Sequence, residues 1–78
     1  MKEFEKRFGL TSVGKGFINL DQLTEAMKIQ ITEDADKAVH RLIGEILVEM
    51  GALNASQVME VLNTMDRNIT LTEEIKTI

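Results

Sequence analysis

The fold of this 78-residue chain is decided by residues 39–62, which read VHRLIGEILVEMGALNASQVMEVL. Six apolar residues recur at helical spacing and form one stripe: Val39, Leu42, Ile43, Ile46, Leu47 and Met50. Gly51 follows the stripe and can adopt the left-handed conformation that ends a helix. Asn54 then offers an N-cap, and Gln57 stands at the position that completes a capping box. The stretch therefore predicts a helix, a tight glycine turn and a second, capped helix.

The same pattern occurs 35 positions earlier in the chain. Gly9 corresponds to Gly44, and Gly16 corresponds to Gly51. Four further pairs are identical: Val13/Val48, Asn19/Asn54, Gln22/Gln57 and Glu25/Glu60. A fixed period of this size is typical of one supersecondary unit that is used more than once. We therefore expect two repeat units, at about residues 2–32 and 35–66.

These patterns predict an all-α fold, in which two helix-turn-helix repeats pack as one small domain over residues 1–78. The four helices are expected near 2–14, 20–32, 35–50 and 55–66. Phe4 and Phe8 are placed on the inner face of the first helix. Residues 67–78 form a tail, which we expect to be a short helix or a frayed end.

The composition limits the classes of partner and the location that are expected. The chain has 9 Lys and Arg against 13 Asp and Glu, a net charge of −4 and no Cys. Because nucleic-acid binding requires a cationic surface, long nucleic acid is a poor partner. The N-terminus lacks the apolar segment of a signal peptide, and no apolar run is long enough to cross a bilayer, so we expect a cytoplasmic location and no membrane partner. A core this small favours a protein partner or self-association.

Few residues could carry out catalysis. His40 is the single histidine, and the sequence places no carboxylate or hydroxyl partner on its face. The acids Glu33, Asp34 and Asp36 lack the spacing of a calcium loop. We therefore predict that the chain is not an enzyme, with no catalytic residue, no metal site and no cofactor.

Gly9 and Gly44 lie inside predicted helices, so ending a helix does not explain why glycine stands at these positions. A glycine inside a helix costs about 1 kcal/mol relative to alanine. Close approach of another helix would offset this cost, and so would close approach of a ligand to the bare backbone. The spacing favours helix packing and leaves the ligand as the alternative.

The repeat also resembles a known motif. Residues Arg7-Phe8-Gly9, Ser12, Gly16, Leu23, Met27 and Gln30 look like R-L-G-x-x-L-x-x-x-G followed, after six residues, by L-x-x-x-L-x-x-Q. This is the motif of the N-terminal, MshEN-type domain of bacterial type II secretion and type IV pilus assembly ATPases. That domain resembles a tandem of two such motifs, and some members bind cyclic di-GMP. The resemblance covers residues 7–65.

The resemblance implies a set of ligand-binding residues: Arg7, Gly9, Gly16, Leu23 and Gln30 in the first half, and Arg41, Gly44 and Gly51 in the second. An arginine suits a guanine edge or a phosphate, and an amide can both donate to and accept from a base. The second half departs from the motif, because Leu42 stands at the arginine position and Met65 at the glutamine position. Arg41 lies one place early.

Three functions follow as expectations. The first is a non-catalytic regulatory or protein-interaction module that docks a partner or a second copy through an apolar groove. Its methionines suit an adaptable surface, and Met59 is the one that leaves the apolar stripe of its helix. The second is a cyclic di-GMP sensor. The third is a helix-turn-helix DNA binder, which the acidic charge disfavours.

Overall fold

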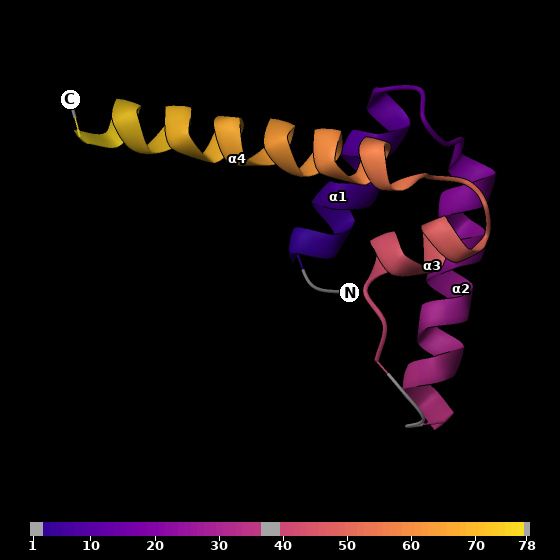
Figure 1. The fold of residues 1–78 in the computed structure, drawn as a ribbon. Helices are drawn as coiled ribbons and strands as arrows, with labels where there is room; N and C mark the ends of the chain where they lie inside the picture. The colour runs from indigo at the N-terminus through magenta and orange to yellow at the C-terminus, as the bar shows by residue number, and fades with distance from the viewer. Residues whose placement is uncertain (1–2, 37–39, 78) are drawn as a thin grey trace.

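The computed structural model describes the backbone of residues 3–36 and 40–77, and the side chains of residues 3–36 and 40–66. Within these ranges the chain forms four α-helices and no strand, as the sequence predicts. The helices are α1 (Glu3–Gly14), α2 (Leu20–Asp36), α3 (Ile43–Glu49) and α4 (Ala55–Thr77) (Figure 1). The all-α prediction is therefore confirmed.

The two glycine turns have the same geometry. Gly16 and Gly51 adopt left-handed φ angles of 78° and 80°. Across each turn, the amide of the residue after the glycine donates back over five residues, from Phe17 to Ser12 at 3.1 Å and from Ala52 to Leu47 at 2.9 Å. These bonds satisfy carbonyls that the helix end leaves without a partner. The glycines thus end the first helix of each unit, as predicted.

Both second helices begin with the predicted capping box. Asn19 accepts a hydrogen bond from the backbone of Gln22 at 2.8 Å, and the Gln22 side chain accepts one from the backbone of Asn19 at 2.9 Å. Asn54 and Gln57 repeat this exchange at 2.8 and 3.0 Å. The local structure is therefore duplicated along with the sequence.

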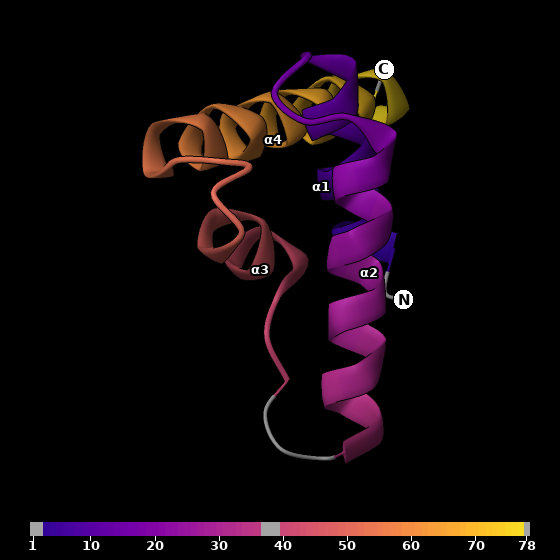
Figure 2. The same ribbon diagram turned by 90° about the vertical axis from the view of Figure 1, so that its right-hand side faces the viewer.

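The core forms between the two units. Helix α2 packs mainly against α3, and α1 packs mainly against α4. Figure 2 shows α3 beside α2, with α4 lying across the top of the view. One apolar cluster joins all four helices and the two turns, with Phe8, Leu23, Ile43, Leu47 and Val61 among its buried members. Because the main packing partner of each helix lies in the other unit, neither unit buries its apolar face alone.

Two helix boundaries in the middle of the chain were predicted wrongly. Helix α2 continues to Asp36 instead of ending near residue 32, and α3 begins at Ile43 instead of near residue 35. Leu42 is extended, with φ −71° and ψ 150°, so its side chain leaves the predicted stripe and is half exposed. Val39, the first residue of that stripe, lies outside the described residues.

The start of α3 is set by a long-range contact. The amide of Ile43 donates to the buried carboxylate of Glu5 at 3.0 Å. The amide of Leu42 donates to the Glu45 carboxylate at 3.2 Å. Amides at a helix start have no partner within the helix, so these acids fix where α3 can begin. Asp34 and Asp36 lie at the end of α2 and do not start the third helix.

Helix α4 is longer than predicted. Its backbone is helical to Thr77, so residues 67–77 continue α4 where the sequence predicted a separate tail. In Figure 1 the end of α4 extends beyond α1, and the molecule measures 46 × 25 × 19 Å. The side chains from residue 67 onward lie outside the described part of the chain.

Candidate functional site

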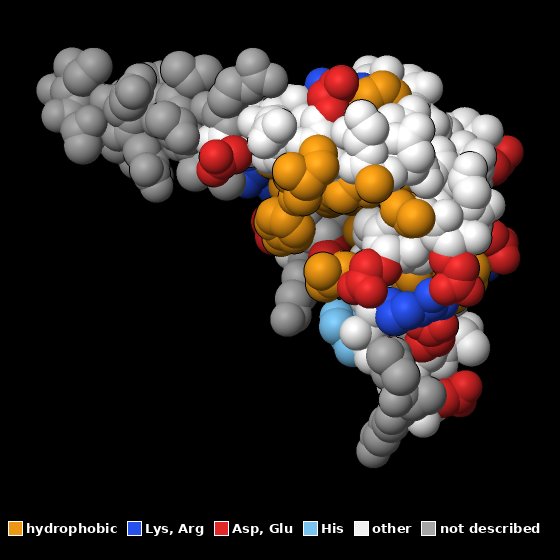
Figure 3. Space-filling view, viewed as in Figure 1, with side chains coloured by type: hydrophobic (Ala, Val, Ile, Leu, Met, Phe, Trp, Pro, Cys, Tyr) orange, Lys and Arg blue, Asp and Glu red, His pale blue; other side chains and the backbone are white. Residues whose placement is uncertain are grey.

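An apolar groove of about 340 Å³ lies between α1, α3 and the start of α4, from Ala55 to Leu62. Its lining comes from both repeat units: Phe4, Glu5, Phe8, Leu42, Ile43, Gly44, Glu45, Val48, Ala55, Val58, Met59 and Leu62. Ten of these twelve residues are apolar or glycine. The space-filling view shows hydrophobic side chains gathered on the face where α4 meets α3 and α1 (Figure 3).

Gly44 lines the groove where α3 meets α1. A Cβ atom at this position would lie 3.1 Å from Cζ of Phe8, which is closer than ordinary packing allows. The missing side chain therefore lets the Phe8 ring of α1 lie on the backbone of α3. This is the helix-packing explanation that the sequence favoured for the glycine.

Four large apolar side chains of the groove remain open to solvent. Phe4 is 51% exposed, Leu42 49%, Val48 41% and Met59 57%. Contiguous exposed apolar surface on a small protein marks an interaction site more often than isolated exposed residues do. Phe4 was predicted on the inner face of its helix and instead forms one edge of the groove.

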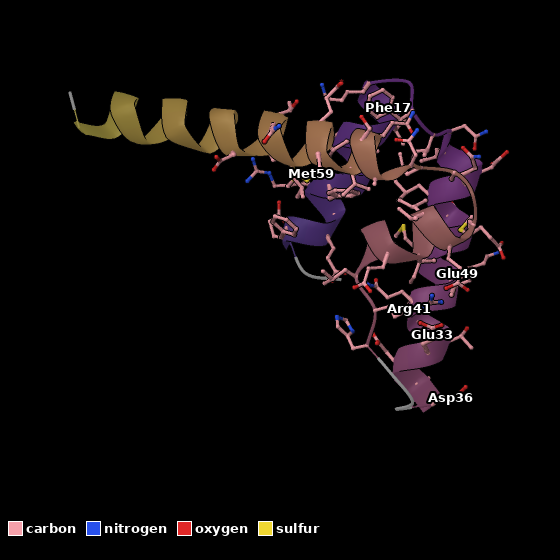
Figure 4. The ribbon with its side chains drawn as sticks, viewed as in Figure 1. Phe17, Glu33, Asp36, Arg41, Glu49 and Met59 are labelled. Carbon is pink, nitrogen blue, oxygen red and sulfur yellow. The ribbon has the colours of Figure 1, made fainter. Side chains whose placement is uncertain are left out.

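The methionines Met27, Met50, Met59 and Met65 have different roles. Met65 is buried in the core and Met27 packs against it, whereas Met50 is at the surface outside the groove. Met59 is exposed and lines the groove, labelled on α4 in Figure 4. Departure from the apolar stripe was therefore a sequence signal that pointed to this site, as was the unexplained glycine at position 44.

Among the side chains that the structure describes, the charged ones that line the groove are acids. Glu5 is buried, and its Oε1 atom accepts hydrogen bonds from the Ile43 amide and from the Gln30 side chain. Glu45 is exposed. A second hollow next to the groove shares Phe4 and Leu62 with it and is lined by a third acid, Asp66.

The ligand-binding residues expected in the first repeat do not form one open surface. Gly9 is buried, and a Cβ atom added to it would lie 2.6 Å from Cδ1 of the buried Leu23. Gln30 is also buried, and its amide nitrogen donates to Glu5 at 2.5 Å and to the carbonyl of Arg41 at 3.0 Å. Arg7 and Gly16 are exposed. Leu23 and Gln30 thus have roles inside the fold.

In the second repeat, Arg41 is held by two acids. Its guanidinium donates to Glu33 at 3.1 and 2.7 Å and also to Glu49, so that the side chain lies between these residues (Figure 4). The hydrogen bonds from Arg41 lower the pKa of Glu33 below its ordinary value of 4.5. The hydrogen bonds to Glu33 and Glu49 raise the pKa of Arg41. Gly44 lies under Phe8, and Gly51 is exposed in its turn.

His40 has a carboxylate partner, contrary to the sequence interpretation. Its Nδ1 atom lies 2.8 Å from Asp34, and its Nε2 atom lies 4.0 Å from Glu5. The sequence interpretation missed this pair because Asp34 belongs to α2, whereas His40 lies six residues further along the chain and outside that helix. The His40 and Asp34 side chains are about half exposed, and neither lines the groove.

Two other kinds of site are absent from the described residues. None of the helices there is both long enough and apolar enough to span a bilayer. The same residues contain no group of three His, Asp or Glu side chains placed to hold a metal ion. No protein-family model, curated protein or solved structure matches the chain.

Proposed function

We propose that this chain is a non-catalytic protein-interaction module that binds an amphipathic helix in the groove between α1, α3 and α4. One observation carries the proposal: Phe4, Val48 and Met59 leave a shared apolar surface open around a hollow of about 340 Å³. Helix-in-groove recognition uses apolar anchors spaced at i, i+3, i+4 and i+7, which fill such a surface. A methionine at the edge lets the surface adapt to different anchors.

A neutral amphipathic peptide tests the proposal. The probe carries leucines at i, i+3, i+4 and i+7, with alanine and glutamine elsewhere, and is titrated against the protein by calorimetry. We expect micromolar binding with a negative heat-capacity change, because apolar surface is buried. Met59→Glu should weaken binding about tenfold or more, since a charge would enter the apolar contact.

Leu20→Glu is the matched control. Leu20 is 62% exposed at the start of α2, so this substitution adds the same charge outside the groove. Binding should be unchanged in this variant. Absence of binding to the wild-type protein, or equal losses in the two variants, would contradict the proposal.

The cyclic di-GMP alternative rests on the resemblance to secretion and pilus ATPase domains. Two residues which that resemblance assigns to the ligand, Gln30 and Arg41, already hydrogen-bond within the chain. A ligand would have to replace those contacts, so we place this function second. Calorimetric titration with cyclic di-GMP tests it, and a gel shift at low salt tests the DNA-binding alternative.

A further inference from the structure

We infer that the partner in the groove is a cationic amphipathic helix, with Lys or Arg residues beside its apolar anchors. This inference rests on the proposed function, because it names the chemistry of the helix that the groove would bind. Charge around an interface steers partners and rejects wrong ones more than it sets the affinity. The charges near the groove therefore decide which helix is favoured.

The groove and the hollow beside it are lined by acidic residues as well as apolar ones. Among residues 3–36 and 40–66, whose side chains the structure describes, the charged residues that line them are Glu5, Glu45 and Asp66, and none is a lysine or arginine. Arg41 precedes the lining residue Leu42, but two carboxylates, Glu33 and Glu49, surround its single guanidinium. That cluster therefore adds negative charge to the region and no positive charge.

A second copy of the chain is a less suitable occupant. The chain has a net charge of −4, and a copy bound groove to groove would bring the Glu45 residues of both chains into one interface. Like charges brought together at an interface disfavour that partner. The exposed Glu45 carboxylate instead attracts lysine or arginine residues that flank an apolar stripe. Charge complementarity therefore selects a basic partner helix.

Three peptides test the inference. They share the leucine spacing of the neutral probe and carry lysine, glutamine or glutamate at the flanking positions. At low salt we expect the lysine peptide to bind about tenfold more tightly than the glutamate peptide, with the glutamine peptide between them. The difference should shrink at 1 M salt, where the screening length is about 3 Å.

A variant that removes one negative charge tests whether the preference for the lysine peptide arises in the groove. Glu45→Gln keeps a side-chain acceptor for the Leu42 amide and removes the charge from the groove. It should weaken binding of the lysine peptide about threefold, and by more than it changes binding of the glutamine peptide. Glu25→Gln is the control, because Glu25 is exposed on α2 and does not line the groove. This control should bind all three peptides as the wild type does.

The outcomes separate the two proposals. Equal binding of all three peptides would overturn the cationic partner and leave helix docking intact, whereas binding of none would overturn both. Sedimentation of the protein alone checks the competing occupant. A dimer that Met59→Glu dissociates and Leu20→Glu does not would identify a second copy in the groove and overturn the inference. A monomer at all concentrations is the expected result.

Discussion

The side-chain amide of Gln30 donates a 2.5 Å hydrogen bond to the carboxylate of Glu5, and both residues are buried. The same carboxylate oxygen accepts the amide of Ile43, and the same Gln30 nitrogen donates to the carbonyl of Arg41. The pair therefore joins α1 and α2 to the segment that begins α3. Because α3 forms one wall of the groove, this contact positions the proposed binding surface.

Replacing Gln30 with leucine should destabilise the fold by about 1.5–3 kcal/mol, because it removes a hydrogen bond from a buried carboxylate. The double variant Glu5→Leu with Gln30→Leu should lose less stability than the sum of the two single variants, since no unpaired charge remains. Urea unfolding of the four proteins measures both effects. Additive losses would show that the two side chains do not act as a pair.

Gly9→Ala should destabilise the protein by about 1–3 kcal/mol, the usual cost of overpacking a core. The added Cβ would lie 2.6 Å from Leu23, and the strain should exceed the gain of about 1 kcal/mol from alanine in a helix. Thermal unfolding measures the net change. Leu23→Ala should cost less in the Gly9→Ala background than alone, and an equal cost would mean that the two residues do not clash.

Replacing Gly14 or Gly16 with alanine should change the stability of the protein in opposite directions. A Cβ at either position meets no neighbour within 4 Å, but only Gly16 has a positive φ. Gly14→Ala should stabilise α1 by about 0.4–1 kcal/mol, and Gly16→Ala should destabilise by about 1–2 kcal/mol. Gly51→Ala should match Gly16→Ala, because the second turn repeats the first. Chemical denaturation measures these changes. The account would be contradicted if Gly14→Ala and Gly16→Ala changed the free energy of unfolding in the same direction.

The contact between Glu33 and Arg41 should make stability depend on pH in the acidic range. The Arg41 hydrogen bonds hold the pKa of Glu33 below 4.5 in the folded protein. Its contribution is therefore fully present above about pH 4.5 and is lost as the pH falls through the lowered folded value. The difference in melting temperature between wild type and Glu33→Gln should be constant near neutral pH and shrink below pH 4.5. A difference that grows on acidification would contradict the assignment.

The sequence predicted those parts of the fold that depend on neighbours along the chain. Gly16 and Gly51 end helices, and Asn19 and Asn54 begin them, because each acts within a single turn of backbone. The start of α3 was predicted wrongly because its amide at Ile43 depends on Glu5, thirty-eight residues away. Helical periodicity carries no information about such a contact.

The groove could be predicted only in part. Met59 was noted because it leaves the apolar stripe of α4, and it does line the groove. Phe4 and Val48 gave no such signal, because their exposure depends on how α1 and α3 meet α4 across the repeat. The pairing of Arg41 with Glu33 and Glu49 was also missed, since residues 40–42 were predicted inside a helix and instead lie before α3.

The binding surface can be located directly by titrating the isotope-labelled protein with the lysine peptide and following its backbone amide signals by NMR. We predict that the largest shifts fall on Gly44, Val48 and Met59, which line the groove from two helices. Gly16 and Leu20, outside the groove, should move little. Shifts centred on Gly16 and Arg7, or no shifts at saturating peptide, would contradict the assignment of this groove as the site where the protein binds its partner.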